Sequence, residues 1–363
     1  MIKGCPVLEI DLDKITENTY RIVNRCNERG IKVIGVTKGF CAMHQIVDAL
    51  IAGGIEELAD SRMENIIELR ERQPYTPITL LRIPHLSNVK NVIQYVNTSV
   101  NSEISVIRAL ANAAINVNKV HRIILMVDLG DLREGIMQEN VLDTVSQFSK
   151  LSGVTLVGLG TNMGCFGGVL PSVNNLGLLA EIGLAVENQI GRKLEVVSGG
   201  GTSTLLLVEN GSIPEAINQL RIGEGILLGT DTTNNRIIPW LYQDTFTISA
   251  EVIEVKDKPS VPIGKIGKDA FGNVPKFNDV GIRKRAILAL GRQDVYIEGI
   301  FPLDKDLSIL GASSDHTIVD ITETSKDIAV GDKMVFGLTY PGLLSATDSK
   351  YVKSHFKGGM YIS

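Results

Sequence analysis

The feature that most constrains this chain is an alternation of short apolar runs with segments whose apolar residues recur at helical spacing, from about residue 10 to residue 235. This alternation is typical of parallel strands joined by crossover helices. Eight runs are present, at residues 32–38, 56–61, 76–82, 97–102, 121–130, 154–162, 194–200 and 219–229. Eight such units favour a closed (β/α)8 barrel of the TIM type over an open sheet. The run at 97–102 is polar and short, and it is the weakest of the set.

After residue 235 the pattern changes to segments with apolar residues at every second position, separated by Gly, Asp and Pro. This pattern predicts a mostly antiparallel β domain. We therefore predict an α/β protein with an N-terminal (β/α)8 TIM-type barrel over residues 10–235. A C-terminal β domain over residues 236–363 follows, and we expect an N-terminal strand at residues 1–9 to join it.

The charge and the cysteines exclude several classes of protein. The net charge of −5 is spread along the chain, so there is no electrostatic footprint for nucleic acid or an anionic membrane. The N-terminus lacks a signal-peptide core, and no apolar run approaches the roughly 20 residues of a membrane span. The four cysteines are far apart, which suits neither a disulfide framework nor a metal site. We expect a soluble cytoplasmic protein with free thiols and no bound metal.

Lys38 ends the first apolar run, after the residues VIGV. Functional groups of TIM-type barrels lie at the C-terminal ends of the strands. A lysine that points into the barrel mouth is partly desolvated, which lowers its pKa and favours the free amine that condenses with an aldehyde. The alternative is a strand-end lysine that extends into water.

Two glycine-bearing segments follow the last two runs: SGGGTS at residues 198–203 and RIGEG at residues 221–225. Glycines let the backbone approach a ligand closely, and free N–H groups at the start of a helix attract an anion, usually phosphate. Phosphate sites in these barrels often use the last two strand ends. A tight turn is the alternative for each segment. One amine and one divided anion site match the two ends of pyridoxal 5′-phosphate (PLP).

Arg133 lies just past the fifth run, in the sequence DLGDLREG. Its planar guanidinium can bind a carboxylate or phenolate through two parallel hydrogen bonds. The alternative is a loop arginine that pairs with Asp131 or Glu134.

The segments PVLEIDLDKITENTYRIV, VIGVTKG, VDLGDLREG, GTSTLLL and LRIGEGILLG resemble those of the alanine racemase family of fold-type-III PLP enzymes. The resemblance spans nearly the whole chain. It implies that Lys38 is catalytic and holds PLP as a Schiff base, and that Arg133 lies near the phenolic oxygen and the substrate carboxylate. It further implies a cofactor site that includes Asn162, Ser198, Gly201, Thr202, Ser203, Arg221, Gly223, Glu224 and Tyr340.

In this resemblance, the phosphate binds mainly to backbone N–H groups, and the Tyr340 hydroxyl also reaches it. Arg221 faces the pyridine nitrogen. Because an arginine does not readily exchange its proton, this nitrogen should stay unprotonated, which suits racemisation better than transamination.

The chain also departs from the pattern of alanine racemases. In GRQDV, Arg292 takes the place of the tyrosine that the family supplies as a second base. Met126 replaces a lysine, and Asn162 replaces a histidine often stacked on the ring. These differences resemble the ornithine racemase branch. We expect Asp294 to pair with a terminal substrate amine, and Ser314, in GASSD, to approach the partner subunit's active site.

The resemblance therefore predicts a homodimeric, PLP-dependent racemase of a basic amino acid, with ornithine as the first choice. Three alternatives stay open: an alanine or broad-spectrum racemase, a PLP lyase, aldolase or decarboxylase, and a non-catalytic PLP carrier. For the acid/base on the second face, the candidates are Cys165, Tyr296, His316 and Asp294.

Overall fold

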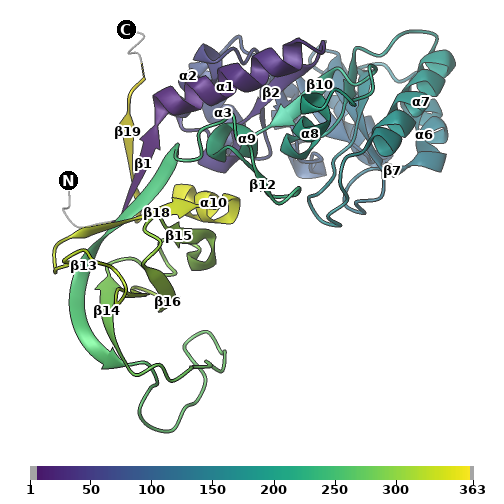
Figure 1. Cartoon of the computed structure of the whole chain (residues 1–363). Helices are drawn as coiled ribbons and strands as arrows, with labels where there is room; N and C mark the ends of the chain where they lie inside the picture. The colour runs from purple at the N-terminus through teal and green to yellow at the C-terminus, as the bar shows by residue number, and fades with distance from the viewer. Residues whose placement is uncertain (1–5, 360–363) are drawn as a thin grey trace. The chain divides into compact units, whose positions relative to one another are not determined.

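The computed structural model describes residues 6–359, which divide into two compact units (Figure 1). The barrel unit is Leu12–Gln243, and the β unit combines residues 6–11 with residues 244–359. The segment 236–243 lies with the barrel because it packs on the first helix. Asn18 Nδ2 donates a hydrogen bond to the Tyr242 carbonyl (2.9 Å), and Arg21 Nη1 donates one to the Trp240 carbonyl (2.7 Å).

Within the described residues, eight parallel strands form a closed ring, and the pairing of β5 with β6 closes it. Each predicted run contains one strand, so the predicted barrel is confirmed. The strands are β2 (Lys32–Val36), β3 (Leu58–Asp60), β4 (Ile78–Leu80), β5 (Thr98–Asn101), β6 (His121–Asp128), β8 (Val154–Gly160), β9 (Val196–Ser198) and β10 (Gln219–Ile222). A short strand, β7 (Ile136–Met137), pairs beside β6.

The helices of the barrel unit connect these strands. They are α1 (Leu12–Asn27), α2 (His44–Ala52), α3 (Met63–Arg72), α4 (Val89–Tyr95), α5 (Ile104–Ile115), α6 (Val141–Phe148), α7 (Val173–Ile190), α8 (Leu205–Glu209) and α9 (Glu224–Leu228). Short 3-10 turns include η1 (Lys38–Phe40) and η4 (Thr202–Thr204). The last predicted run changes from strand to helix at Gly223, so that only its first four residues form β10.

The register of the strands shows which side chains face the barrel interior. Gly35 faces α2, since a Cβ there would lie 3.0 Å from the side chains of Leu50 and Ile55. Successive strand residues alternate between faces, so Ile34 and Val36 point inward. Arg221 is the register partner of Ile34 and therefore shares the inner face.

The β unit is mostly antiparallel, as predicted. Its main sheet has the order β15-β18-β13-β14-β17-β16, and β1 pairs antiparallel with β13 and parallel with β19. Residues 1–5 of the predicted N-terminal strand lie outside the described residues. The elements are β1 (Val7–Asp11), β13 (Phe246–Pro259), β14 (Ile282–Leu288), η5 (Ile297–Gly299), β15 (Ile300–Pro302), β16 (Ser308–Ala312), β17 (Thr317–Asp320), β18 (Lys333–Leu338), α10 (Tyr340–Asp348) and β19 (Lys353–Lys357).

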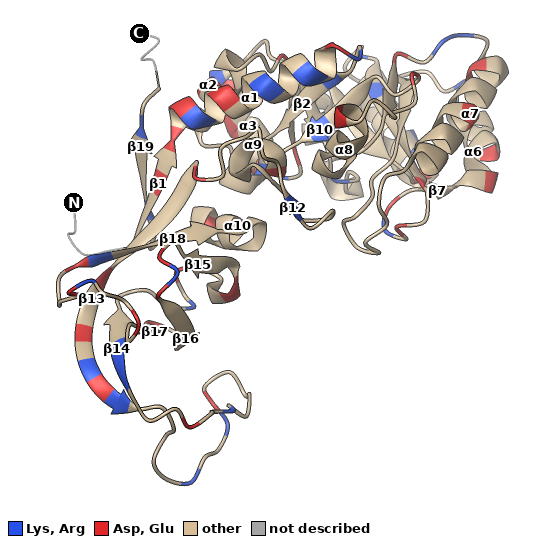
Figure 2. Cartoon of the chain, in the orientation of Figure 1, with Lys and Arg blue, Asp and Glu red and all other residues tan. Residues whose placement is uncertain are grey.

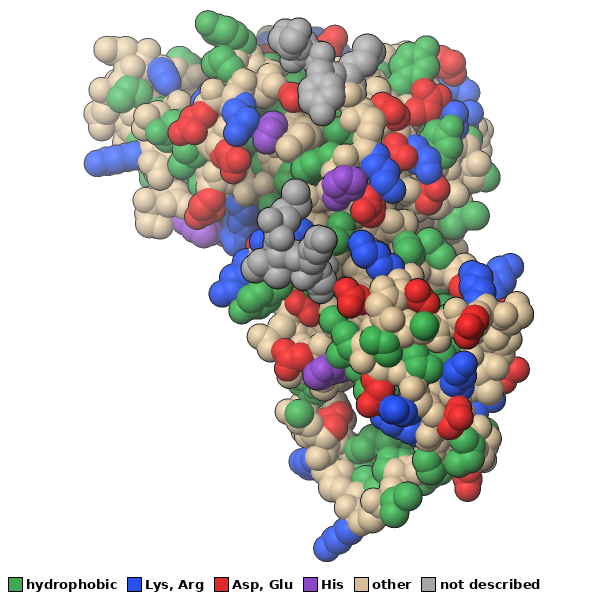
Figure 3. Space-filling view, turned by 90° about the vertical axis from the view of Figure 1, so that its left-hand side faces the viewer, with side chains coloured by type: hydrophobic (Ala, Val, Ile, Leu, Met, Phe, Trp, Pro, Cys, Tyr) green, Lys and Arg blue, Asp and Glu red, His purple; other side chains and the backbone are tan. Residues whose placement is uncertain are grey.

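Charges of both signs are interspersed along α1 and β13 (Figure 2) and over the face shown in Figure 3. Between residues 6 and 359, no helix has the length and apolar character needed to cross a membrane. In the same part of the chain, no three His, Cys, Asp or Glu residues are grouped so that they could hold a metal ion.

The contact between β8 and β9 predicts the effect of one methyl group. In Gly158→Ala, the new Cβ would lie 2.1 Å from the Val196 carbonyl oxygen, so the strands must separate. We expect the free energy of unfolding to fall by about 1–3 kcal/mol. The matched control is Gly177→Ala in α7, where the added Cβ meets nothing within 4 Å. It should raise stability by about 0.5–1 kcal/mol. Urea unfolding measures both, and equal effects would contradict this packing.

Candidate active site

Lys38 is the first residue of η1, directly after β2. By surface area the residue is exposed, yet protein atoms crowd its amine, and this burial lowers the pKa of Lys38. The charge of Arg133 lowers this pKa further, while Cys165, Asp60 and Glu134 oppose the shift. These groups therefore share the barrel mouth with the Lys38 amine.

A buried pair fixes the chain just before Lys38. Thr37 Oγ1 donates a 2.5 Å hydrogen bond to Asp60 Oδ2, and both residues are fully buried. Asp60 also accepts hydrogen bonds from the Arg62 N–H (2.8 Å) and from Asn65 Nδ2 (3.1 Å). Asp60 was not predicted as a site residue from the sequence. The feature that could have indicated it is the presence of an acidic residue at the end of an apolar strand.

Arg221 lies at the end of β10, and the structure brings Ser198 into contact with it. The guanidinium donates hydrogen bonds to Ser198 Oγ and to the Thr161 carbonyl, the latter at 2.6 Å. Gly160 lies beside it, since a Cβ there would be in van der Waals contact with Nη1 at 3.5 Å. Arg221 is only 8% exposed, and burial lowers its pKa to about 10. The side chain is therefore a buried cation at neutral pH, held by neutral oxygen atoms.

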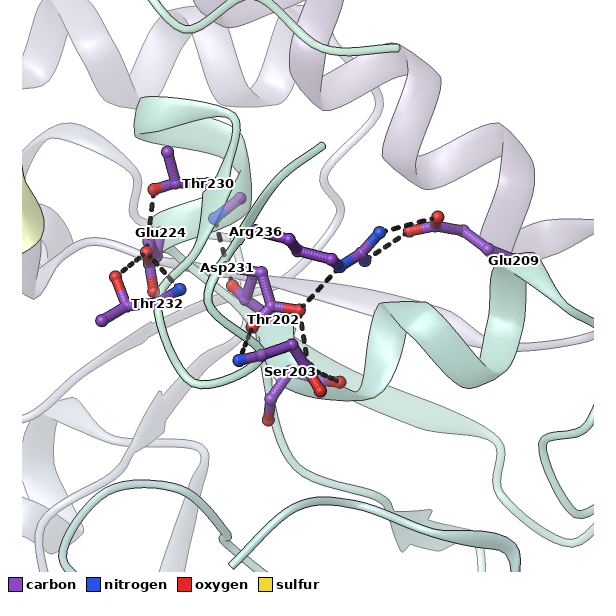
Figure 4. Close-up of polar contacts among 10 residues, drawn as sticks. Thr202, Ser203, Glu209, Glu224, Thr230, Asp231, Thr232 and Arg236 are labelled. Atoms are coloured by element: carbon purple, nitrogen blue, oxygen red, sulfur yellow. Dashed lines mark hydrogen bonds and ion pairs between the residues drawn. The ribbon is translucent and has the colours of Figure 1, made fainter. Parts of the chain in front are cut away.

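The two predicted anion segments lie side by side. The Gly225 N–H donates a 3.1 Å hydrogen bond to Thr202 Oγ1, which joins the start of α9 to the start of η4 (Figure 4). A Cβ at Gly201 would lie 3.0 Å from the Arg221 carbonyl oxygen, so the close approach of these segments favours glycine. At the start of η4, the N–H groups of Thr202 and Ser203 precede any acceptor within the helix and suit an anion.

Glu224 and Gly223 begin the second anion segment. The Glu224 carboxylate turns away to accept hydrogen bonds from Thr230 Oγ1 (2.8 Å) and the Thr232 N–H (2.9 Å). Glu224 can therefore bind an anion only through its backbone N–H. A Cβ at Gly223 would lie 3.3 Å from Val36 Cβ, so this turn packs closely on β2.

Arg133 pairs with Glu134, with 2.7 Å between Arg133 Nη2 and Glu134 Oε1. This is one of the two pairings that the sequence left open. Arg133 is exposed, and its charge influences the pKa of both Lys38 and Arg221. Its predicted place at the barrel mouth agrees with these influences, while its role toward a ligand stays a prediction.

Asp131, in contrast, binds the loop that follows β8. This residue is 1% exposed, and its carboxylate accepts hydrogen bonds from the N–H groups of Gly164 (3.0 Å), Cys165 (3.3 Å), Phe166 (3.0 Å) and Val169 (3.2 Å). The loop that carries Arg133 is thereby joined to the loop that carries Asn162. Sequence reasoning missed this role, for which the only signal is the acidic residue inside DLGDLREG.

Asn162 and Cys165 lie in this second loop. Asn162 Nδ2 donates a 3.3 Å hydrogen bond to Cys165 Sγ. Cys165 influences the pKa of Lys38, Arg133 and Arg221, which places its thiol near all three cations. The predicted cofactor residue Asn162 therefore lies at the same mouth.

The other predicted site residues belong to the β unit. Asp294 Oδ2 accepts a 2.8 Å hydrogen bond from the Gly291 N–H, and Ser314 Oγ donates one to Asp315 Oδ2 (2.7 Å). Their loops touch, because a Cβ at Gly291 would lie 2.2 Å from the Ser314 carbonyl oxygen. Tyr340 is the first residue of α10. The roles of Asp294, Ser314 and Tyr340 stay predictions.

Comparison with known proteins identifies the family. Residues 10–231 match the model of the alanine racemase N-terminal domain. The chain belongs to the alanine racemase family. Family members include an ornithine racemase of Acetoanaerobium sticklandii, 42% identical over 96% of this chain and 98% of the relative. A lysine racemase of Thermotoga maritima is 42% identical over 97% of this chain and 98% of the relative.

The fold agrees with that of solved alanine racemases. An alanine racemase of Clostridium difficile 630 superposes with a TM-score of 0.76 over 98% of this chain and 97% of its own, at 18% identity. The alanine racemase family is PLP-dependent, and so is this enzyme. The residues at the mouth fit that cofactor: they combine a crowded amine, a buried guanidinium and two adjacent backbone segments suited to an anion.

The hydrogen bonds to Asp131 predict a measurable loss of stability. Asp131→Asn removes the charge that four backbone N–H groups share, and we expect a loss of about 1–3 kcal/mol in the free energy of unfolding. The control is Asp143→Asn on the exposed face of α6, which should change stability by less than about 0.5 kcal/mol. Urea unfolding compares the two. Equal stability of both variants would show that Asp131 does not join the loops.

Proposed function

We propose that this chain is a PLP-dependent racemase of a basic amino acid, with the two enantiomers of ornithine as its substrates. Full-length similarity to an ornithine racemase and a lysine racemase supports this substrate class. The observation that carries the proposal is the crowded amine of Lys38, at the same barrel mouth as Arg221 and the two anion segments. Lysine is the second candidate substrate, because both relatives share 42% identity with this chain.

We assign the cofactor contacts as follows. Lys38 is the point of attachment, and backbone N–H groups of Thr202, Ser203, Gly223 and Glu224 bind the phosphate. Ser198, through its contact with Arg221, and Gly201 would line the site, Asn162 would lie beside the ring, and Tyr340 would add its hydroxyl to the phosphate. When bound, PLP withdraws electrons from the Cα of the attached amino acid and so makes its proton acidic.

The chain's own groups then move and hold protons. Lys38 Nζ takes the α-proton on one face and returns it, and its lowered pKa favours the free amine that this step needs. Arg133 binds the substrate carboxylate through its guanidinium. Arg221 would donate a hydrogen bond to the ring nitrogen of bound PLP and keep its own proton, since its pKa of about 10 lies well above neutral pH.

We propose further that the enzyme is a cytoplasmic homodimer. Among the described residues, the cysteines Cys26 and Cys165 are free thiols, as suits a reducing compartment. In the dimer, the β unit of one subunit presents Ser314 to the partner's site, and Asp294 there pairs with the terminal amine of the substrate. The side-chain ammonium of ornithine is positively charged, and a carboxylate at the position of Asp294 would form a charge-assisted hydrogen bond with it.

Incubation of the PLP-loaded enzyme with single L-amino acids in D2O tests the proposed function. We expect loss of the α-proton signal and formation of the D-enantiomer with ornithine, and a lower kcat/KM with lysine. Lys38→Ala should lower the exchange rate by about 10³-fold or more, since it removes the base. Lys90→Ala, on the exposed face of α4, is the control and should match the wild type.

Two results would contradict the proposal. Release of CO2 in place of α-proton exchange would indicate a decarboxylase. Bound PLP without turnover of any amino acid would indicate a cofactor carrier.

A further inference from the structure

A short hairpin outside the barrel ring contacts both predicted phosphate segments. It consists of β11 (Thr230–Asp231) and β12 (Arg236–Ile237), which pair antiparallel, and we call it the 230–237 hairpin. Figure 4 shows its side chains between the start of η4, the end of α8 and the start of α9. None of its residues is among the predicted site residues.

Asn234 connects the hairpin to the first phosphate segment. Its Nδ2 donates a 3.0 Å hydrogen bond to the Ser203 carbonyl and a 2.8 Å bond to Asp231 Oδ2. Its backbone N–H also donates to Asp231 Oδ1 (3.2 Å). Since Asp231 is 1% exposed and holds Asn234 at two points, the amide has a fixed direction, and the Ser203 peptide is fixed with it.

Arg236 connects the hairpin to the end of α8, the helix that follows the first phosphate segment. Its Nη1 and Nη2 bind the Glu209 carboxylate at 3.0 and 2.7 Å, and its Nε binds Asp231 Oδ2 at 3.2 Å. The side chains of Arg236 and Glu209 are only 20% and 16% exposed. A paired, sheltered guanidinium–carboxylate contact is stronger than an exposed ion pair. Glu209 ends α8, so the hairpin holds the segment from Ser203 to Glu209 at both ends.

The second phosphate segment is held by the same hairpin. The Glu224 carboxylate accepts hydrogen bonds from Thr230 Oγ1 (2.8 Å), the Thr232 N–H (2.9 Å) and Thr232 Oγ1 (2.5 Å). The hairpin tip also packs on the Asn162 loop, where a Cβ at Gly164 would lie 2.3 Å from Thr233 Cγ2. The 230–237 hairpin therefore contacts both phosphate segments.

We propose that the 230–237 hairpin sets the spacing between the two backbone segments that bind the cofactor phosphate, with Asn234 as its main positioning residue. The inference deepens the proposed function and rests on it. Three phosphate oxygens need donors from both segments at once, and small errors in the spacing weaken such a site. The hairpin acts through Ser203 and Glu224 and need not touch the cofactor.

Titration of the apoenzyme with PLP and with pyridoxal, which lacks the phosphate, tests this inference. The variants are Asn234→Ala and Glu209→Gln, and the control is Asn91→Ala on the exposed face of α4. In Asn234→Ala, we expect the Kd for PLP to rise about tenfold, as one lost hydrogen-bond contact predicts, and the Kd for pyridoxal to change less than about twofold. Glu209→Gln should show the same selective loss, and Asn91→Ala should match the wild type for both ligands. Circular dichroism confirms that each variant is folded.

An unchanged Kd for PLP in both folded variants would overturn the inference. So would an equal loss of affinity for PLP and pyridoxal, because general damage to the barrel does not discriminate by the phosphate. Failure of the wild type to bind PLP would instead overturn the proposed function itself.

Discussion

The buried guanidinium of Arg221 is the interaction on which the site depends. It crosses the barrel mouth from β10 to Ser198 at the end of β9 and to Thr161 just after β8. A buried cation is costly unless its donors are bonded, so these oxygens hold three neighbouring strand ends in one arrangement.

The positions of the other predicted site residues follow from the register of the barrel strands. Arg221 is the register partner of Ile34, and the β2 strand that contains Ile34 leads into Lys38. The turn that begins at Gly201 lies against the Arg221 carbonyl, which brings the start of η4 beside the same residue. An amine with a lowered pKa, a buried cation and a turn suited to an anion are thus positioned by one strand register. Under the proposed function, the same register would let the barrel hold an elongated cofactor at both ends, with Lys38 placed to transfer a proton.

Sequence reasoning located the barrel because periodicity and strand-end position are local properties. The polar residues of β5 make it the strand most difficult to predict, yet hydrogen bonds join several of them. Ser99 Oγ lies 2.8 Å from His121 Nε2, and Asn101 Nδ2 donates to Ser99 Oγ at 2.9 Å, while Asn101 Oδ1 is buried without a partner among the described residues. The positions of Lys38 and of the glycine turns at strand ends are local properties of the same kind, and their roles stay predictions. The roles of Asp131 and of the 230–237 hairpin were not predicted, because they depend on where distant backbone groups meet. The Asp131 contact, for example, requires left-handed backbone at Leu132 and Gly164, and the residue types alone do not predict this conformation.

The central claim is that the Lys38 amine is the group that binds the cofactor covalently. Borohydride reduction of the PLP-loaded enzyme, followed by proteolysis and mass spectrometry, tests it most directly. The account predicts one pyridoxyl phosphate per chain, on the peptide that contains Lys38. A label on another lysine, or none after reduction, would contradict it.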